Sequence, residues 1–306
     1  MVQRIDLHLH TDASDGAAPV EVLVARAALA GLTTIALTEH DNVDSWERGQ
    51  RAAKQNGVRL MPGIEISTRH EDQDIHLLGY DFSPDAPMLR HLIDYQRQLR
   101  EKRFRAILRR LHDLGVRIAP ALIHTEKTSA PGRVHIAQAL VAAGLVPDVE
   151  SAFKRYLRRG KPAYVPYETV TPAEAVQVVH EAGGFVSLAH PVFSTGGARL
   201  REKLVDAGLD AIEVLHPRHS QALQSSLIEF CRRRRLLITG GSDWHGTLDE
   251  PYDLGEWFLQ GNGTSRRSGR ASLTQILRNV QPVSPARRRA AARTAHAPRN
   301  IFRTRR

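Results

Sequence analysis

The sequence predicts an α/β fold, either one large α/β domain or a barrel of parallel strands that carries an insertion. Apolar strands alternate with amphipathic helices over residues 1–83 and again from about residue 172. A chain of 306 residues, 42% of them hydrophobic, can bury a sizeable core. Seven short apolar runs also end on a histidine or a carboxylate, and they cover residues 5–10, 34–40, 61–65, 75–79, 185–190, 211–216 and 237–245. Strand ends of a parallel barrel converge on one mouth, so these groups are expected to meet there.

In the first part of the chain, the order of predicted strands, helices and helix-ending glycines indicates successive βαβ units. A helix is expected to begin after Pro19 and to stop at Gly31. A second helix is expected over residues 44–56, and Gly57 closes it before a strand at 58–61.

Strands then give way to a helical insertion, and strand–helix alternation resumes after it. The insertion is expected to contain helices at 88–115, 134–144 and 149–157. Later elements are expected as helices at 172–182, 199–207 and 220–233 with strands at 185, 211 and 236. The predicted parts are barrel at 1–85, a substrate-recognition insertion at 86–162, barrel at 163–262, and an arginine-rich tail at 263–306.

The net charge of +10 comes from the end of the chain. Residues 263–306 contain 12 arginines and no lysine, aspartate or glutamate, so the rest of the chain carries 31 basic and 33 acidic side chains. The tail has two interpretations. It is either a solvated, disordered extension or an electrostatic handle for RNA whose affinity would fall steeply with salt.

Cysteine usage and hydropathy favour a cytoplasmic protein. Cys231 is the one cysteine, which excludes an internal disulfide framework and indicates a reducing compartment. No basic-then-apolar leader follows Met1, and no apolar stretch is long enough to span a bilayer. No membrane partner is therefore expected, and the oligomeric state stays open.

The motif His8-x-His10, followed by Asp15, indicates metal binding. Residues two apart point to the same side of an extended chain, so both imidazoles can bind one ion. Imidazole together with carboxylate favours Zn²⁺, Mn²⁺ or Fe²⁺ over Mg²⁺ or Ca²⁺. A single His-x-His pair is weak evidence, but six further strands that end in similar groups make chance a poor explanation.

Five motifs in order resemble the signature motifs of the polymerase and histidinol phosphatase (PHP) superfamily. They are His8-Leu9-His10-Thr11-Asp12-Ala13-Ser14-Asp15-Gly16, Thr38-Glu39-His40-Asp41, Gly63-Ile64-Glu65, Ala189-His190-Pro191 and Gly241-Ser242-Asp243-Trp244-His245. The insertion and residues 156–162 resemble the branch of 3′,5′-nucleoside bisphosphate phosphatases, some of which also trim RNA from its 5′ end.

The resemblance implies a distorted (β/α)7 barrel with three divalent ions at its mouth, Mn²⁺ being expected before Fe²⁺ or Zn²⁺. One ion would take His8, His10, Glu65 and Asp243, a second would share Glu65 and add His76 and His190, and the third would use Asp15, His40 and His245. Clustered ions of this kind would activate a bridging water as hydroxide and neutralise charge on a phosphate ester.

Further roles are expected for residues beside these motifs. Glu65 would bridge two ions, and Asp41 and Glu39 are candidates to orient the His40 imidazole. His219 is expected either at the mouth, as a proton donor or phosphate contact, or in an ordinary loop role.

Substrate recognition is expected from the insertion. Arg133 and His135 stand at a predicted helix start, where a guanidinium and free backbone N–H groups suit an anion. The resemblance implies that both hold substrate phosphate, and Arg133 would hold the phosphate that is not hydrolysed. The arginines between 97 and 110 on the long helix could line a channel for a polyanion, but a solvated helix face is the preferred reading.

The predicted function is a metal-dependent phosphoesterase acting on a small nucleotide such as 3′-phosphoadenosine 5′-phosphate. A 5′-to-3′ exoribonuclease acting on short RNA is the alternative enzyme. A non-catalytic RNA-binding module and a histidinol-phosphate phosphatase are weaker alternatives, the latter resting on kinship alone. The absence of a GxxxxGKS loop argues against ATP hydrolysis.

Overall fold

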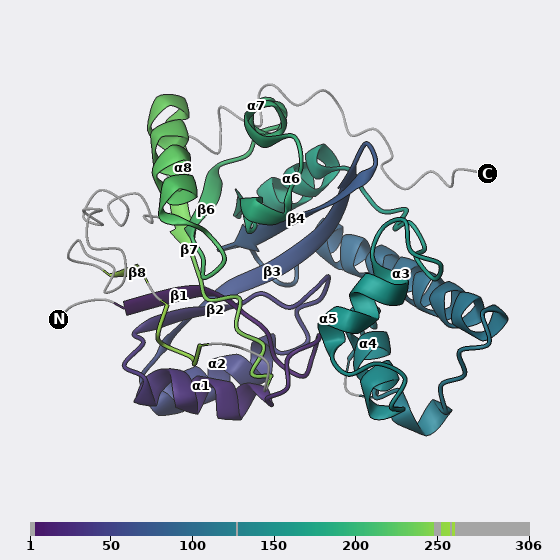
Figure 1. Cartoon of the computed structure of the whole chain (residues 1–306). Coiled ribbons are helices and arrows are strands. Elements are labelled where there is room, and N and C mark those ends of the chain that lie inside the picture. The colour runs from purple at the N-terminus through teal and green to yellow at the C-terminus, as the bar shows by residue number, and fades with distance from the viewer. Residues whose placement is uncertain (1–3, 127, 248–251, 258, 261–306) are drawn as a thin grey trace.

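A curled mixed sheet lies at the centre of the computed structural model, which describes residues 4–126, 128–247, 252–257 and 259–260 (Figure 1). The sheet follows the order β7-β6-β5-β4-β3-β2-β1-β8. Its strands are β1 (Arg4–Leu9), β2 (Thr34–Leu37), β3 (Arg59–His70), β4 (Gln73–Tyr80), β5 (Phe185–Leu188), β6 (Ala211–Leu215), β7 (Leu237–Gly240) and β8 (Leu259–Gln260). The predicted α/β class with a distorted barrel and a helical insertion is confirmed.

Two helices, α1 (Val20–Leu29) and α2 (Trp46–Asn56), cover the first strands. Both end where predicted because a glycine with a positive φ follows each, 75° at Gly31 and 68° at Gly57, whereas α2 begins two residues later than the predicted 44. Leu23 of α1 and Ala53 of α2 are buried in one core cluster with Ile35 of β2. This packing fixes the ends of β1 and β2, where the first histidines stand.

Strand β4 runs antiparallel to both of its neighbours, which corrects the expectation of a parallel strand that ends in a ligand. The chain reverses tightly between His70 and Gln73, and Glu71 takes a φ of 52°. So short a connection joins antiparallel strands, whereas parallel strands need a longer crossover. His76 consequently lies in the first half of β4 rather than at its C-terminal end.

The sheet curls until its first and last long strands meet. The amide of Asp243, just after β7, donates to the His8 carbonyl at 2.9 Å, and the His10 amide donates to the Trp244 carbonyl at 3.0 Å. These bonds bring the loop after β7 against β1 and close the mouth around the site.

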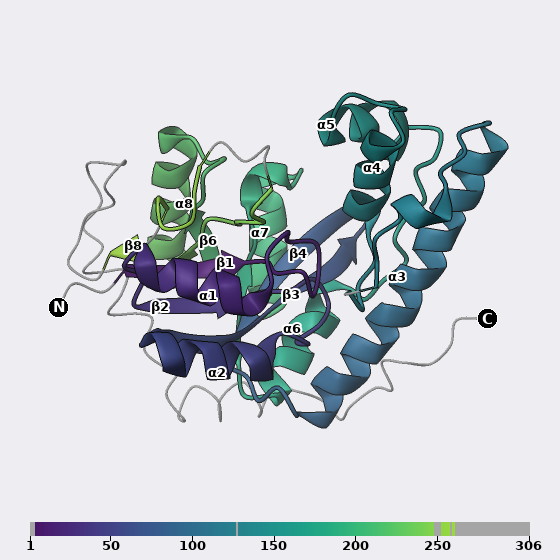
Figure 2. The ribbon, with the colours of Figure 1, turned by 90° about the horizontal axis from the view of Figure 1, so that it is seen from below.

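Helix α3 (Pro87–Asp113) runs from the barrel into the insertion, which stands to one side of the sheet in both views (Figures 1 and 2). Its first half buries Leu92 in the core shared with the sheet, and its second half buries Ile107 in a separate cluster. That second cluster also contains residues of α4 (Arg133–Ala142), α5 (Val149–Ala152) and the π-helical turn Phe153–Leu157.

The remaining described helices follow the predicted alternation. They are α6 (Pro172–Glu181), α7 (Gly197–Asp206), α8 (Gln221–Arg234) and the short 3₁₀ helices Pro120–Leu122 and Pro191–Phe193. No helix among the described residues combines the length and apolar character needed to cross a membrane. The predictions for the tail at 263–306 concern residues outside those that the structure describes.

Candidate metal centre and substrate pocket

The predicted ligand residues converge at the mouth of the curled sheet. We call these nine residues the histidine–carboxylate cluster, and they are His8, His10, Asp15, His40, Glu65, His76, His190, Asp243 and His245. Within the described residues they form four overlapping sets, and the donor atoms of each set lie within 4.8 Å of one another. The structure therefore gathers side chains that are separated by more than two hundred positions.

Glu65 lies at the centre of this cluster and is buried. Backbone bonds fix its place, since its amide donates to the Glu39 carbonyl and its carbonyl accepts from the Asp41 amide. Its Oε1 lies 2.7 Å from His76 Nδ1 and 2.9 Å from His190 Nε2, and its Oε2 lies 3.0 Å from His40 Nδ1, 3.3 Å from His10 Nε2 and 3.4 Å from His8 Nε2. Each carboxylate oxygen thus faces a different group of imidazoles, as a bridging ligand requires.

Distances around His8 and His10 fit ligands that share one ion. Their Nε2 atoms lie 3.2 and 3.3 Å from Asp243 Oδ1. Ligand atoms about 2.1 Å from one ion, at tetrahedral or octahedral angles, would be roughly 3.0–3.4 Å apart. Both Nε2 atoms are buried and, within the described residues, make no hydrogen bond. Buried polar atoms left without a partner in this way fit a bound cation.

A second part of the cluster surrounds Asp15. Its Oδ1 lies 3.3 Å from His245 Nε2, and its Oδ2 lies 3.5 Å from His40 Nε2. Burial would raise the pKa of the Asp15 carboxyl, but the two imidazoles hold it well below its usual value. Burial also opposes the charge on His245, yet Asp15 raises the pKa of that imidazole to about 10. A protonated His245 imidazole would thus compensate the Asp15 carboxylate.

Three residues at this mouth hold strained backbone conformations. Asp41, His190 and Asp243 have φ values of 52°, 25° and 54°, although none is glycine. Such conformations cost on the order of 1–3 kcal/mol each and cluster at functional sites. They turn the chain sharply after β2, β5 and β7.

Hydrogen bonds orient the first two histidines. His8 Nδ1 lies 2.9 Å from Glu213 Oε1, which leaves Nε2 facing the cluster. His10 Nδ1 lies 3.3 Å from Ser14 Oγ, whose hydroxyl donates to Glu39 Oε2 at 2.5 Å. Carboxylates that hold the far nitrogen of a ligating imidazole are typical of metal sites.

The prediction that Asp41 and Glu39 orient the His40 imidazole is wrong. Asp41 Oδ2 accepts from Arg100 Nε at 2.5 Å, and its Oδ1 accepts from the Ser67 amide at 2.7 Å. Glu39 accepts instead from Ser14 and from the Thr11 amide and hydroxyl. Asp41 has a φ of 52°, and Gln96 and Arg100 of α3 hold its carboxylate away from the His40 ring.

The structure places His219 next to the site, and its predicted role as a proton donor or phosphate contact, or in an ordinary loop, stays a prediction. His219 is buried beside His216, with ring centroids 5.0 Å apart, and its Nδ1 lies 2.9 Å from the Val214 carbonyl oxygen. Because a carbonyl only accepts, Nδ1 carries the hydrogen. Burial lowers the pKa of the ring, which favours the neutral form with an unprotonated Nε2.

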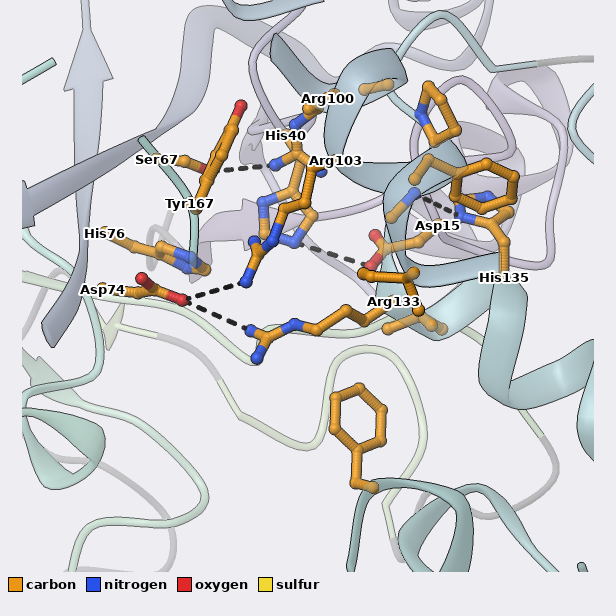
Figure 3. A pocket seen from close by; sticks show the side chains of 17 residues that line it. Asp15, His40, Ser67, Asp74, His76, Arg100, Arg103, Arg133, His135 and Tyr167 are labelled. Atoms are coloured by element: carbon orange, nitrogen blue, oxygen red, sulfur yellow. Dashed lines mark hydrogen bonds and ion pairs between the residues drawn. The ribbon is translucent and has the colours of Figure 1, made fainter. Parts of the chain in front are cut away.

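A cavity of about 160 Å³ adjoins the cluster on the side of the insertion (Figure 3). Asp15, His40 and His76 line it from the cluster side, while Arg103 and Arg133 enter it from α3 and α4. Other lining residues include Ser67, Asp74, Arg100, Phe104, Phe153 and Tyr167. We call this cavity the arginine pocket.

Two guanidinium groups in this pocket share one carboxylate. Arg103 Nη2 lies 3.5 Å and Arg133 Nη2 lies 3.7 Å from Asp74 Oδ2, as the dashed lines in Figure 3 show. Burial and the neighbouring Arg133 lower the pKa of Arg103 to about 10. Both groups stay charged at neutral pH, and one carboxylate does not balance them, so the pocket suits an added anion.

Four of the six predicted α3 arginines are exposed, as the preferred reading of a solvated face expects, and they are Arg97, Arg105, Arg109 and Arg110. The other two differ. Arg100 is buried and Arg103 lines the pocket, whereas Arg105 stays exposed and pairs with Glu101. The helix therefore has one polar edge that faces the site and one that faces solvent.

His135 lines the arginine pocket, and the protein itself supplies hydrogen-bond partners to its ring. Its Nδ1 accepts from the Gly132 amide at 3.2 Å, and its Nε2 lies 3.0 Å from the Ser14 carbonyl oxygen. Both ring nitrogens thus have protein partners, and the ring ties the start of α4 to the loop that carries Asp15.

Sequence reasoning expected the runs 5–10 and 211–216 at the mouth but named neither a ligand role nor an orienting role for Asp6, Glu213 or His216. Glu213 accepts from the His190 amide at 2.7 Å as well as contacting His8, and His216 Nε2 lies 3.4 Å from Asp243 Oδ2. Asp6 accepts from the amides of His8 and Ser242, and burial raises its pKa to about 7. A signal existed for Glu213, because a carboxylate in the middle of an apolar strand needs a buried partner.

Comparisons with known proteins agree with this geometry. Residues 6–163 match the model of the PHP domain. The chain is 34% identical to a 5′-3′ exoribonuclease of Haemophilus influenzae over 80% of this chain and 91% of that protein. It is 30% identical to a 3′,5′-nucleoside bisphosphate phosphatase of Chromobacterium violaceum over 82% and 90% of the two chains.

A solved structure shares the fold. A protein from Bifidobacterium adolescentis, assigned as a metal-dependent phosphoesterase, superposes with a TM-score of 0.78 at 29% identity and covers 93% of this chain and 98% of its own. The match to the PHP domain spans more than half of the chain, and both relatives align over most of their length. The chain therefore belongs to the PHP family and is a metal-dependent phosphoesterase.

Proposed function

We propose that this enzyme removes one phosphate from a nucleotide that carries two, a 3′,5′-nucleoside bisphosphate such as 3′-phosphoadenosine 5′-phosphate. One observation carries the proposal: the arginine pocket and the histidine–carboxylate cluster share walls. Asp15, His40 and His76 belong to both. A substrate with two phosphate groups can place one at the cluster and the other against the arginines.

The cluster would hold three divalent ions, Mn²⁺ first among the candidates and Fe²⁺ or Zn²⁺ after it. Bound ions would neutralise charge on the reacting phosphate and lower the pKa of a bound water. His8, His10 and Glu65 are fully buried, so they would fix positions deep in the site. His40, His76, His190, Asp243 and His245 are partly exposed and would hold the side open to substrate.

Arg133 would hold the phosphate that is not hydrolysed, and Arg103 would assist it. Both line the arginine pocket, and Asp74 keeps their guanidinium groups directed into it. His135 would act indirectly, by fixing the start of α4, where Arg133 stands.

A 5′-to-3′ exoribonuclease is the second candidate, because a relative with that name aligns over 80% of this chain. The same two sites would then hold the first nucleotide of an RNA strand. A non-catalytic RNA-binding module has no need for the nine clustered ligand-type side chains, which weighs against that third reading.

The test compares Arg133→Ala with Arg105→Ala, a matched change at an exposed arginine of the long helix. Protein loaded with Mn²⁺ would be assayed on adenosine 3′,5′-bisphosphate and on the two adenosine monophosphates. Loss of a charged hydrogen bond predicts that Arg133→Ala raises KM for the bisphosphate roughly 10- to 100-fold and removes its advantage over the monophosphates. Equal kinetics in Arg133→Ala and wild type would reject the assigned role, and no turnover of any nucleotide would reject the function.

A further inference from the structure

We propose that Phe193 and Arg218 form a subsite for a second nucleotide, beside the histidine–carboxylate cluster and outside the arginine pocket. We call these two residues the β5–β6 subsite, because they follow β5 and β6. The inference rests on the proposed function and extends it: the subsite would let a phosphodiester occupy a site that otherwise takes a terminal phosphate.

Phe193 is a solvent-exposed aromatic side chain beside the candidate metal ligand His190. It is 61% exposed, whereas the other phenylalanine, tyrosine and tryptophan side chains in the part of the chain that the structure describes are buried or half-buried. Its ring centroid lies 5.3 Å from that of His190 and 6.2 Å from that of His216. An exposed ring at this place offers a face on which a base can stack.

The backbone fixes the position of this ring. Phe193 belongs to the 3₁₀ turn Pro191–Phe193, and its amide donates to the His190 carbonyl at 3.0 Å. Two residues later the amide and hydroxyl of Thr195 both donate to Gln73 Oε1, at 2.9 and 2.7 Å. The turn is therefore anchored at both ends, so the exposed ring is presented in a defined place relative to the cluster.

Arg218 is anchored by its backbone to the same histidine ring that Phe193 faces. Its amide donates to His216 Nδ1 at 3.1 Å, so Phe193 and Arg218 both lie against His216. The Arg218 side chain is exposed and forms no ion pair with the residues that the structure describes. A guanidinium with these properties suits a phosphate of a nucleic-acid backbone.

The order of the strands explains why a second nucleotide would reach this subsite. The arginine pocket lies against Ser67 of β3 and His76 of β4, whereas the β5–β6 subsite follows the next two strands of the sheet. A terminal phosphate has one ester bond, to the nucleoside in the pocket. A phosphodiester has a second ester bond, to the next nucleotide. That nucleotide must extend from the cluster in a direction other than that of the arginine pocket. In Figures 1 and 2, α7, which follows the Phe193 turn, stands apart from α4 and α5 of the insertion.

The test measures kinetics on adenosine 3′,5′-bisphosphate, on a 5′-phosphorylated triribonucleotide, and on the same triribonucleotide with an abasic second position. Variants are Phe193→Ala, Phe193→Leu, Phe193→Tyr and Arg218→Ala, with Leu29→Ala as a control at an exposed apolar residue far along the chain. Metal content per chain is measured for each, to show that His190 is undisturbed.

We expect Phe193→Ala and Phe193→Leu to raise KM for the triribonucleotide roughly tenfold and to leave KM for the bisphosphate within twofold. Phe193→Tyr should keep the wild-type KM for the triribonucleotide, because tyrosine also offers an aromatic face. On the abasic substrate, all Phe193 variants should have the same KM as the wild type. Arg218→Ala should weaken triribonucleotide binding most at low salt.

Equal effects of Phe193→Ala on both substrates, or no effect on either, would overturn the subsite. Wild-type enzyme that hydrolyses the bisphosphate but not the triribonucleotide would also overturn it, while leaving the proposed function intact. Wild-type enzyme that hydrolyses only the triribonucleotide would reject the phosphatase proposal and still allow the Phe193 comparison to decide the subsite.

Discussion

Replacing Arg100 with methionine should destabilise the enzyme by about 3 kcal/mol. Arg100 is 9% exposed, and its guanidinium donates from Nε to Asp41 Oδ2 at 2.5 Å and from Nη2 to Ser67 Oγ at 2.8 Å. Removing one partner of a buried ion pair costs about 3–5 kcal/mol because the other charge stays buried without compensation. Asp41 keeps bonds from the Ser67 amide and from Gln96 Nε2, which places the cost at the lower end of that range.

A double-mutant cycle separates the ion pair from simple packing. Asp41→Asn removes the buried carboxylate charge, so Arg100→Met should cost less in the Asp41→Asn background than in the wild type. The difference, which is the coupling energy, should be about 1–2 kcal/mol. Chemical denaturation of all four proteins in the same metal-free buffer measures it.

Turnover of the four proteins tests the role of Asp41. If Asp41 acts through its contact with α3, the Arg100→Met/Asp41→Asn protein should retain activity within about tenfold of wild type once it is loaded with metal. A coupling energy near zero would refute the electrostatic reasoning. Abolished turnover in Asp41→Asn, with normal stability and metal content, would instead restore Asp41 as a catalytic residue.

Three further predictions concern the cluster and its supports. Glu213→Gln should weaken metal binding by roughly 10- to 100-fold, measured by chelator competition. The glutamine side chain has one acceptor oxygen, so it cannot accept from both His8 Nδ1 and the His190 backbone amide as the two carboxylate oxygens do. An unchanged metal affinity would refute this. Gly241→Ala should destabilise the fold by at least about 2 kcal/mol in denaturant titrations, since a Cβ there would lie 2.4 Å from His8 Cβ and 2.5 Å from its amide nitrogen. Because the folded-state pKa of His245, about 10, exceeds its ordinary value of 6.5, this residue stabilises the metal-free protein fully below about pH 6.5 and loses that effect as pH rises towards 10. The Tm of metal-free wild type should therefore fall across that window more steeply than that of His245→Asn, and parallel curves would contradict the assignment.

Local signals in the sequence were sufficient for most elements of the fold. Gly31 and Gly57 end α1 and α2 as predicted, because only glycine adopts a positive φ there at little cost. The direction of β4 was not predictable in the same way. Its turn contains Glu71 and Asp72 rather than an Asn-Gly or Asp-Gly pair, so no hairpin signal separated it from a parallel strand.

For the candidate site too, the sequence was sufficient to predict some features and not others. Residue type at a strand end was enough to propose His8 or Asp243 as a ligand, since the fold itself brings strand ends together. The partners of those ligands depended on side-chain direction. Glu213 meets His8 across 205 positions, and Asp41 turns away from its neighbour His40 towards a helix of the insertion. Neither contact follows from composition or spacing.

Helix α3 gives a physical reason for the specificity towards two phosphates that we propose. Arg100 and Arg103 are three residues apart, so they lie one turn apart on the same face. Arg100 is held by Asp41, the residue after His40, whereas Arg103 faces the wall of the pocket with Arg133. One rigid helix thus sets the separation between the cluster and the arginines. A substrate whose two phosphates match that separation contacts both the cluster and the arginines without rearranging the protein. A substrate with a shorter or longer spacing can contact only one of the two sites.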